Sequence, residues 1–395
     1  MLRKWVAFLL PSRPIQRKPI TLLMHICMVA FSDLRFDYRI FREALSLQKA
    51  GHKITVFSTA FDKQPLEDWK HIDTQLLQID RSQSLRKLYP MFWQWAFTRL
   101  RSIKADVFHA HDLDALWPCA RAAKRLNRPL IYDSHEFWTE QSSLVNRPLI
   151  QAIWSRLEQH LVPQTHRIIT VSQAIADSLS KKYPEAPPIT VLRNLPMYRS
   201  YENSSRIRTQ LNISPTSPIV LYQGGFLFDN GLIEQIRAAK DFGDAVFVLI
   251  GSGPCEQELK SLVEKEGLEE KVYFIDRVPF YKLHSYTCSA DLGLCLIKGT
   301  GKSFYHSLPN KLFEYIMGGL PVIASDFPEM KEVIQKTDVG TTIDPTDIDS
   351  ISHEVRNVLK MQKELARRHE SAISASKIYN WEKESDVLLQ LYSEL

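Results

Sequence analysis

Short apolar runs alternate along the chain with longer amphipathic segments. Continuous apolar runs of this length are typical of buried parallel strands, and the amphipathic segments between them are typical of covering helices. In the first half, strands are predicted at 20–29, 53–58, 106–110, 129–133, 167–172 and 189–192. After a polar stretch, the alternation restarts, with strands predicted at 219–223, 245–250, 271–275, 290–297, 320–324 and 340–343. The pattern therefore predicts an α/β protein of two tandem doubly wound domains that face a central cleft.

The polar stretch at 198–206 has the composition of a linker and sets the domain boundaries. We expect a Rossmann-like domain over 1–198, a second Rossmann-like domain over 199–375, and a final amphipathic helix in 376–395 that packs back on the first domain. In such folds ligands bind at the carboxyl ends of the strands. The cleft between the domains is therefore the expected binding site.

Composition excludes several classes of protein. The 395 residues are 44% hydrophobic and 24% charged, which fits an ordinary globular protein and neither a disordered nor a collagen-like chain. A net charge of +5 argues only weakly for a polyanionic partner, and we expect no nucleic acid. The five cysteines are scattered without a CxxC pair, which favours a reduced compartment and predicts no metal site.

Two segments bear on contact with a membrane. The N-terminal apolar run at 5–10 is short and ends at Pro11, so we expect no signal peptide, and no stretch is long enough to span a bilayer. Segment 85–104 carries five basic residues, no acids and several aromatic residues. It is typical either of a helix lying on anionic lipid or of a buried helix with a basic rim. We expect a cytoplasmic protein, with peripheral attachment to the inner face of the membrane as the alternative.

Two glycine-rich turns are candidate phosphate sites. LIGSGPCEQEL (249–259) follows a strand and opens a helix, but Glu256 replaces the third glycine of a dinucleotide fingerprint, so the turn indicates either a phosphate site or a tight turn. LIKGTGKSF (296–304) contains the GKS of a P-loop, but Leu296 stands where the first glycine would be. A flexible loop that carries Lys298 and Lys302 towards an anionic ligand is favoured over an ATPase.

Histidines and acids gather in two loops of the first half. HAHDLDAL (109–116) and YDSHEFWTE (132–140) both follow predicted strands and should face the cleft. A metal centre is one interpretation, but no HExxH or comparable ligand spacing is present. We favour a site of chemistry, with structural histidines as the alternative.

One carboxylate stands out in the second half. NKLFEYIMGG (310–319) has apolar residues at helical spacing and two glycines that suit a helix stop, with Glu314 inside the apolar run. A buried carboxylate is costly unless it has polar partners. Glu314 therefore faces either a polar cleft or solvent.

Several segments resemble glycosyltransferase family 4, the retaining sugar transferases of the GT-B fold. They are TVSQAIADSL (170–179), VLRNLP (191–196), YQGGFLFDNGL (222–232), LIGSGP (249–254) and above all PNKLFEYIMGGLPVIASDFPEMKEVI (309–334). The resemblance covers nearly the whole chain, from 36–58 to the helix around Trp381. It implies a nucleotide sugar held mostly by the second domain, an acceptor on the first, and no metal cofactor.

The resemblance assigns roles to individual residues. Glu314 matches the family glutamate that accepts hydrogen bonds from the donor ribose, with Asn310 beside it as a further donor contact. His135 matches the family histidine near the donor sugar, and Asp112 and Glu136 become candidates for binding the acceptor or taking up its proton. For retention, the acceptor attacks on the face that the nucleotide leaves, and no covalent nucleophile is assigned.

The chain departs from the family at three positions. His306 replaces the first glutamate of the family pair, and Gly225 and Asn230 stand roughly where an arginine and a lysine hold the donor diphosphate. A leaving diphosphate needs positive charge or directed amides. We expect compensation from a set of other groups, namely Lys311, Lys302, Arg193 and the backbone amides of Gly224, Gly225 and Ser325.

These residues predict an enzyme that moves a sugar from a nucleoside-diphosphate donor to a growing surface glycan, free or polyprenyl-linked. A nucleotide-sugar epimerase of the same fold is the first alternative. A degenerate binding protein without turnover is the second, and the losses at 225, 230 and 306 keep it open.

Overall fold

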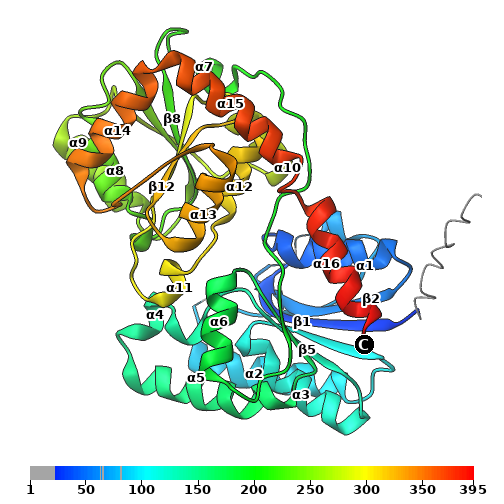
Figure 1. Cartoon of the computed structure of the whole chain (residues 1–395). Helices are drawn as coiled ribbons and strands as arrows, with labels where there is room; N and C mark the ends of the chain where they lie inside the picture. Colours follow the sequence, from blue (N-terminus) through cyan, green and yellow to red (C-terminus); the bar gives the residue numbers. More distant parts are fainter. Residues whose placement is uncertain (1–22, 63, 65, 81) are drawn as a thin grey trace, which may run out of the picture.

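The protein folds into two α/β domains, each built on one parallel sheet (Figure 1). The computed structural model describes residues 23–62, 64, 66–80 and 82–395. The segment on which the signal-peptide exclusion rests lies outside the described residues. The predicted class, two tandem doubly wound domains, is confirmed.

The first sheet has the order β3-β2-β1-β4-β5-β6-β7. Its strands are β1 (His25–Asp33), β2 (Lys53–Ala60), β3 (Asp73–Gln78), β4 (Val107–His111), β5 (Leu130–Ser134), β6 (Arg167–Thr170) and β7 (Ile189–Val191). Its helices are α1 (Tyr38–Lys49), α2 (Leu85–Leu100), α3 (Leu113–Leu126), α4 (Ser142–Val145), α5 (Pro148–Leu161) and α6 (Gln173–Lys182). Short 3-10 turns lie at Glu67–Trp69, Trp138–Glu140 and Val162–Gln164.

The second sheet has the order β10-β9-β8-β11-β12-β13. Its strands are β8 (Ile219–Gly225), β9 (Val246–Ser252), β10 (Val272–Ile275), β11 (Leu292–Cys295), β12 (Val322–Ser325) and β13 (Gly340–Ile343). Its helices are α7 (Arg206–Leu211), α8 (Leu232–Ala239), α9 (Glu256–Glu266), α10 (Phe280–Thr287), α11 (Lys302–Tyr305), α12 (Asn310–Met317), α13 (Pro328–Thr337), α14 (Ile348–Lys360) and α15 (Gln362–Ser376), with a 3-10 turn at Phe228–Asn230.

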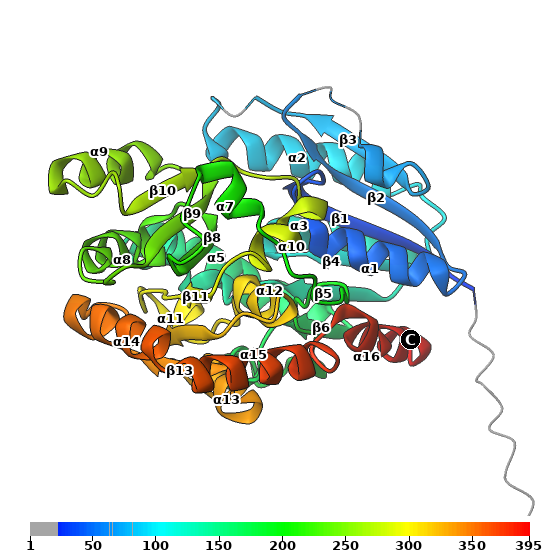
Figure 2. The same cartoon turned by 90° about the horizontal axis from the view of Figure 1, so that it is seen from above.

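The last helix, α16 (Trp381–Ser393), belongs structurally to the first domain. It lies beside α1 in both views (Figure 1, Figure 2). Trp381, Leu388 and Tyr392 join one apolar core with residues of α1 and β1. The Trp381 indole nitrogen donates to the Ser46 hydroxyl at 2.9 Å. The chain thus returns from the second domain to cover a face of the first sheet.

The aromatic residues of α2 point into the protein. Phe92 is fully buried, and Tyr89 and Trp93 pack against Trp154 of α5. The exposed side of α2 carries Leu85 and Met91 together with basic residues. Packing in the core therefore explains why segment 85–104 is rich in aromatic residues, without a contact to lipid. Over the described part of the chain, no helix is both long and apolar enough to cross a membrane.

Candidate active site

Two adjoining cavities open between the domains, at the carboxyl ends of both sheets. Their volumes are about 430 and about 730 Å³. Both are lined by Tyr38 of the first domain and Phe280 of the second, whose rings stack with centroids 4.3 Å apart. Both are also lined by Asn310, Lys311 and Glu314 of α12. The two cavities therefore form one cleft with α12 at its centre.

Glu314 faces this cleft rather than bulk solvent. The apolar residues of α12 pack into the second domain, and the helix stops where Gly319 takes a φ of 68°. Gln223 Nε2 donates to Glu314 Oε2 at 2.6 Å. Burial raises the pKa of Glu314, although Gln223 and the charges of Arg42 and Lys311 act in the opposite direction. The carboxylate therefore keeps acceptor capacity for a ligand in the cleft.

Lys311 lies beneath the glycine-rich end of β8. Its Nζ is 3.2 Å from the Tyr222 hydroxyl and 4.3 Å from the centre of that ring. Gly224 has a φ of 138°, and a Cβ at this position would lie 3.4 Å from the Lys311 side chain. Gly224 and Gly225 line the larger cavity together with Lys311. Backbone and ammonium thus converge on the same part of the cleft.

The turn at 249–259 supports this glycine-rich segment. Gly251 has a φ of 152°, and a Cβ here would lie only 1.9 Å from the Gly224 carbonyl oxygen. Gly251 and Ser252 also line the larger cavity. The glycine is therefore required by the close approach of two strands.

Gly225 and Asn230, which stand where the family has an arginine and a lysine, are in contact in the structure. Asn230 Nδ2 donates to the Gly225 carbonyl at 2.8 Å, and both residues line the larger cavity. Neither side chain supplies a positive charge. Among the residues expected to compensate, Lys311 is linked to this pair, because it bonds Tyr222, whose hydroxyl donates to the Gly225 carbonyl at 2.7 Å.

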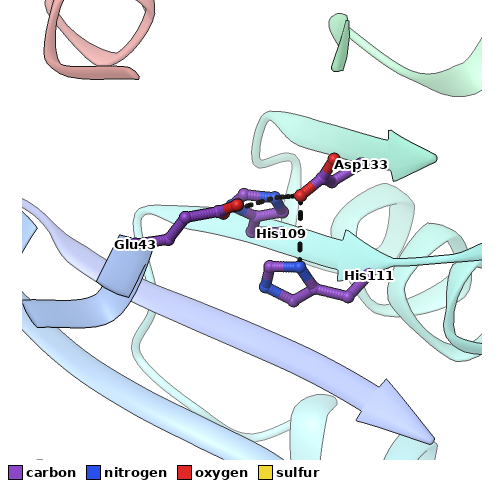
Figure 3. Close-up of side chains that lie close together, drawn as sticks. All are labelled: Glu43, His109, His111 and Asp133. Atoms are coloured by element: carbon purple, nitrogen blue, oxygen red, sulfur yellow. Dashed lines mark ion pairs between the residues drawn. The ribbon is translucent and has the colours of Figure 1, made fainter. Parts of the chain in front are cut away.

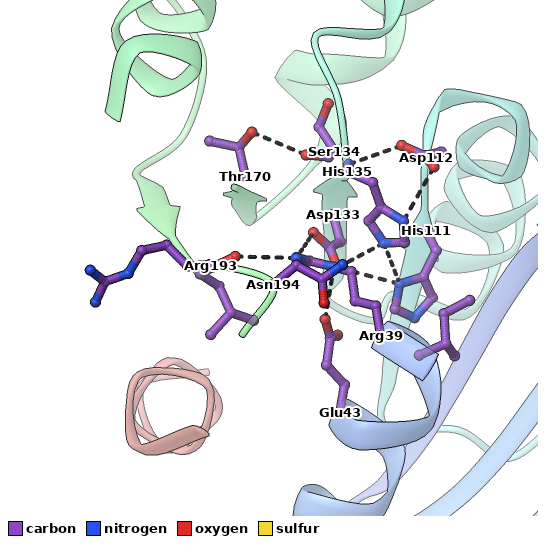
Figure 4. A network of polar contacts seen from close by, with 12 residues as sticks. Arg39, Glu43, His111, Asp112, Asp133, Ser134, His135, Thr170, Arg193 and Asn194 are labelled. Carbon is purple, nitrogen blue, oxygen red and sulfur yellow. Dashed lines mark hydrogen bonds and ion pairs between the residues drawn. The ribbon is translucent and has the colours of Figure 1, made fainter. Parts of the chain in front are cut away.

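Arg193, Lys302 and His306 are not among the described residues that line the two cavities. Arg193 is paired instead with Glu384 of α16 at 2.8 Å, and its side chain points away from the His135 cluster (Figure 4). Lys302 is exposed at the start of α11. The His306 carbonyl accepts from Ser172 at 2.7 Å, and burial lowers the pKa of its ring. In this structure the Arg193 guanidinium is thus engaged by Glu384, and its contact with the diphosphate stays a prediction.

His135 and Glu136 reach the cleft from the first domain, where both line the smaller cavity. Asp112, at the start of α3 with a φ of 65°, accepts from the His135 backbone N–H at 2.9 Å and lies 3.4 Å from its ring. Burial alone would lower the pKa of His135, but Asp112 and Asp133 raise it to about 10. Enclosure and the Asp112 charge raise the pKa of Glu136 to about 7. Asp112 thus holds His135 in place and is not itself among the lining residues.

A buried polar cluster lies below His135 (Figure 3, Figure 4). His109, His111 and Asp133, expected in loops, lie within β4 and β5 and are at most 2% exposed. Asp133 Oδ1 accepts from Arg39 Nη2 at 2.7 Å. Burial would raise the pKa of Asp133, but Arg39 and His135 hold it well below its usual range.

Three residues of α1 belong to the site but were not predicted from the sequence. Arg39 and Glu43 enter the buried cluster, and Arg42 lines the smaller cavity. Burial lowers the pKa of Arg42 to about 10, partly offset by Glu314 across the cleft. One feature of the sequence could have indicated these residues. It is the run of charged residues on a helix whose apolar residues Ile40, Ala44 and Leu47 are buried.

Comparison with known proteins places this cleft in a family. The model described as Glycosyltransferase Family 4 matches residues 39–195, and the model described as Glycosyl transferases group 1 matches residues 203–375. Together the two matches cover both domains. The chain belongs to these group 1 glycosyltransferases of the GT-B fold, and the protein is a glycosyltransferase.

Individual relatives are distant. A 2-deoxystreptamine N-acetyl-D-glucosaminyltransferase of Niallia circulans is 20% identical over 78% of this chain and 78% of its own. A sucrose-phosphate synthase structure from Thermosynechococcus elongatus superposes with a TM-score of 0.79 at 18% identity, covering 94% of this chain and 98% of that one. Anabaena HepE in complex with UDP-glucose gives 0.76 at 17% identity, covering 94% and 100%. At these identities the structures support the fold alone.

Proposed function

We propose that the protein transfers a sugar from a nucleoside-diphosphate sugar to a glycan or lipid-linked acceptor, with retention of configuration, in the synthesis of a cell-surface polysaccharide. The observation that carries the proposal is the pairing, on one helix in the cleft, of a carboxylate and an ammonium. Glu314 presents an acceptor for hydroxyl groups, and Lys311 presents a cation three residues earlier. A nucleotide sugar needs both, one for its ribose and one for its diphosphate.

The donor would lie along the second domain. Gly224 and Gly225 expose backbone at the end of β8, next to the Lys311 side chain. A charged diphosphate can approach glycine backbone closely, and amide dipoles together with the ammonium would stabilise the charge that develops on departure. HepE, a protein of related fold, was determined in complex with UDP-glucose, and the donor proposed here is of that chemical class.

The acceptor would enter from the first domain, where His135 and Glu136 line the smaller cavity. In the proposed step the acceptor oxygen forms a bond to the anomeric carbon as the bond to the diphosphate breaks. The acceptor proton passes to an oxygen of the leaving phosphate on the same face. No covalent enzyme intermediate and no metal cofactor is assigned to this step.

A lipid-linked acceptor would place the protein at the cytoplasmic membrane surface. The best candidate for contact is an exposed apolar and basic face of α5, defined here by Leu149, Ile153, Arg147 and Arg156. Leu149 and Ile153 are 81% and 64% exposed and lie one helical turn apart. Tyr89 and Trp154 join α5 to α2, so the basic exposed side of α2 lies nearby. Apolar residues flanked by arginines suit anionic lipid.

A transfer assay tests the proposal. The protein is incubated with a panel of nucleoside-diphosphate sugars, with and without free and polyprenyl-linked glycan acceptors, and nucleotide release and sugar incorporation are measured. The anomeric configuration of the product is read by NMR. Glu314→Gln is the test variant. Glu158→Gln is the matched control, because Glu158 is also buried and hydrogen-bonded but lies in the first domain away from the cleft.

Nucleotide release that requires acceptor, with an unchanged anomeric configuration and loss in Glu314→Gln alone, is the expected result. Inversion at a ring carbon of the donor sugar without acceptor would instead identify an epimerase. Tight donor binding without any turnover would identify a binding protein, and an inverted anomeric centre would exclude the retaining step.

A further inference from the structure

Four buried side chains from three separate elements converge on one point in the first domain (Figure 3). Glu43 comes from α1, His109 and His111 from β4, and Asp133 from β5. Each offers one oxygen or nitrogen, and these four atoms lie within 4.8 Å of one another. All four residues are at most 2% exposed, and none is among the residues that line the two cavities.

Several polar atoms in this cluster make no hydrogen bond to any residue that the structure describes. They are His109 Nε2, His111 Nε2 and both Glu43 carboxylate oxygens, of which Oε1 is ion-paired with Arg39 Nε at 3.1 Å. His109 Nε2 lies 3.7 Å from Asp133 Oδ2 and 3.9 Å from Glu43 Oε2. These distances are too long for hydrogen bonds. They suit two ligand atoms bound to one ion, since metal–ligand bonds of about 2.0–2.2 Å separate neighbouring ligand atoms by roughly 3–4 Å.

The surroundings resemble a second coordination shell. The Tyr392 hydroxyl lies 2.8 Å from His109 Nδ1, so it can fix the ring with Nε2 directed into the cluster. Arg39 lies 2.7 Å from Asp133 Oδ1 and 3.1 Å from Glu43 Oε1. Glu43 Oε2 and Asp133 Oδ2 lie on the side of the histidines. Asp133 Oδ2 is also approached by Arg39 Nε and His135 Nε2, each at 3.2 Å, and by His111 Nδ1 at 3.3 Å.

Charge favours a cation at this point. Glu43 and Asp133 carry two carboxylates, and Arg39 neutralises one of them. His135 is shared between Asp112, whose Oδ2 lies 3.4 Å from its Nδ1, and Asp133, whose Oδ2 lies 3.2 Å from its Nε2. The three carboxylates of Glu43, Asp133 and Asp112 therefore share the two cations Arg39 and His135. A buried charge without compensation is costly, so the remaining carboxylate requires either a proton or a metal ion.

We propose that Glu43, His109, His111 and Asp133 bind a divalent transition-metal ion, with Zn²⁺ the ion best matched to two imidazoles and two carboxylates. The site is structural. It lies outside the sugar-transfer cleft and joins α1, β4 and β5, with Tyr392 linking it to α16. Because the ligands are enclosed, the ion is taken up as the domain folds.

The metal content of the intact protein tests this proposal without reference to activity. Wild type is expressed with Zn²⁺, Mn²⁺ and Fe²⁺ in the medium, purified without chelator and measured by elemental analysis. It is then unfolded in denaturant with EDTA, freed of both, and refolded with or without ZnCl₂. Glu43→Gln removes a ligand, and Tyr392→Phe removes the hydroxyl beside His109. Glu158→Gln, a buried carboxylate bonded to Tyr132 and Tyr183, is the matched control.

The expected content is about one zinc ion per chain in wild type and in Glu158→Gln, with little in Glu43→Gln. Tyr392→Phe should weaken zinc affinity by about 10- to 100-fold. Refolding with ZnCl₂ should raise the Tm of wild type but not that of Glu43→Gln. A wild type that holds no metal after expression and after refolding with ZnCl₂, with an unchanged Tm, would overturn the proposal and leave a protonated carboxyl in the ion's place.

Discussion

The position of Glu314 in the cleft disfavours the ionised form of its carboxyl group. Burial in the cleft raises its pKa, so the charged form is less favourable in the folded protein than in the unfolded chain. Its contribution to the stability of the unliganded protein therefore falls as pH rises from the ordinary glutamate pKa through the raised value. A donor that hydrogen-bonds to the carboxylate reverses this preference, because it stabilises the charged form.

The raised pKa of Glu314 predicts how the affinity for the donor depends on pH. Affinity for the nucleoside diphosphate should weaken as pH falls from about 8 to about 5, because protonation removes acceptor capacity from Glu314 at a higher pH than for an exposed glutamate. Calorimetric titration across this range measures the effect. Glu314→Gln should bind more weakly and lose this part of the pH dependence, and an identical pH profile in the variant would contradict the assignment.

Removal of the Lys311 ammonium is predicted to weaken binding of the diphosphate but not binding of the base and ribose. Lys311→Met keeps most of the side-chain length and removes the ammonium beneath Gly224. Hydrogen bonds to charged groups contribute about 1.5–3 kcal/mol, so affinity for the diphosphate should fall by roughly 10- to 100-fold. Affinity for the parent nucleoside should stay the same. Lys363→Met, exposed on α15, is the control, and equal losses for nucleoside and diphosphate would place the ammonium elsewhere.

At the scale of elements, α16 ties the end of the chain to the first domain. Leu388 is 1% exposed in the core that α16 shares with α1 and β1. Leu388→Ala should lower the free energy of unfolding by about 2–5 kcal/mol, since it leaves a cavity in that core. Urea unfolding measures the change, and Gln390→Ala, exposed on the same helix, should leave it nearly unaltered. Equal stability of both variants would show that α16 is not a structural part of the domain.

The strands could be predicted wherever both faces of a strand are buried. Each predicted apolar run overlaps an observed strand, because a parallel sheet covered on both faces requires such runs. β3 escaped prediction because it is an edge strand with a half-exposed, largely polar sequence, DTQLLQ. The apolar pattern is therefore absent from this strand.

The site could be predicted in part for a related reason. Glu314, Lys311 and the glycines of β8 stand in local motifs, and the fold carries them into the cleft. Arg39 and Glu43 were not found because their partner, Asp133, is about 90 residues away and adjacent only after β5 packs against α1. The ion pair of Arg193 was not predicted for the same reason, since Glu384 of α16 lies 191 residues further along the chain.

At the scale of the whole molecule, the cleft is closed by contacts between the domains. The Ser142 hydroxyl donates to Asp229 at 2.8 Å, and Ser172 donates to the His306 carbonyl at 2.7 Å. These contacts flank the cavities where donor and acceptor are proposed to meet. Figure 1 shows that the chain crosses between the domains at the linker, in green, and again at the red segment between α15 and α16, on the same side of the molecule.

The membrane proposal also belongs to the whole molecule. Wild type should sediment with vesicles that contain an anionic phospholipid, and more weakly as salt is raised, because arginines and lipid headgroups are screened. Leu149→Asp with Ile153→Asp should abolish sedimentation, since both side chains are exposed on α5. The matched control, Gln390→Asp with Ser393→Asp, puts the same charges on α16. Equal sedimentation of both double variants would exclude the α5 face.

The central claim is that a nucleoside-diphosphate sugar binds in the cleft against Glu314. The most direct test is thermal stabilisation of wild type and Glu314→Gln by a panel of nucleoside diphosphates and their sugars, since a ligand that binds only the folded state raises the Tm. A shift with one nucleotide family, lost in Glu314→Gln while the unliganded Tm is not lowered, is the predicted result. No shift with any nucleotide at saturating concentrations would contradict the donor site.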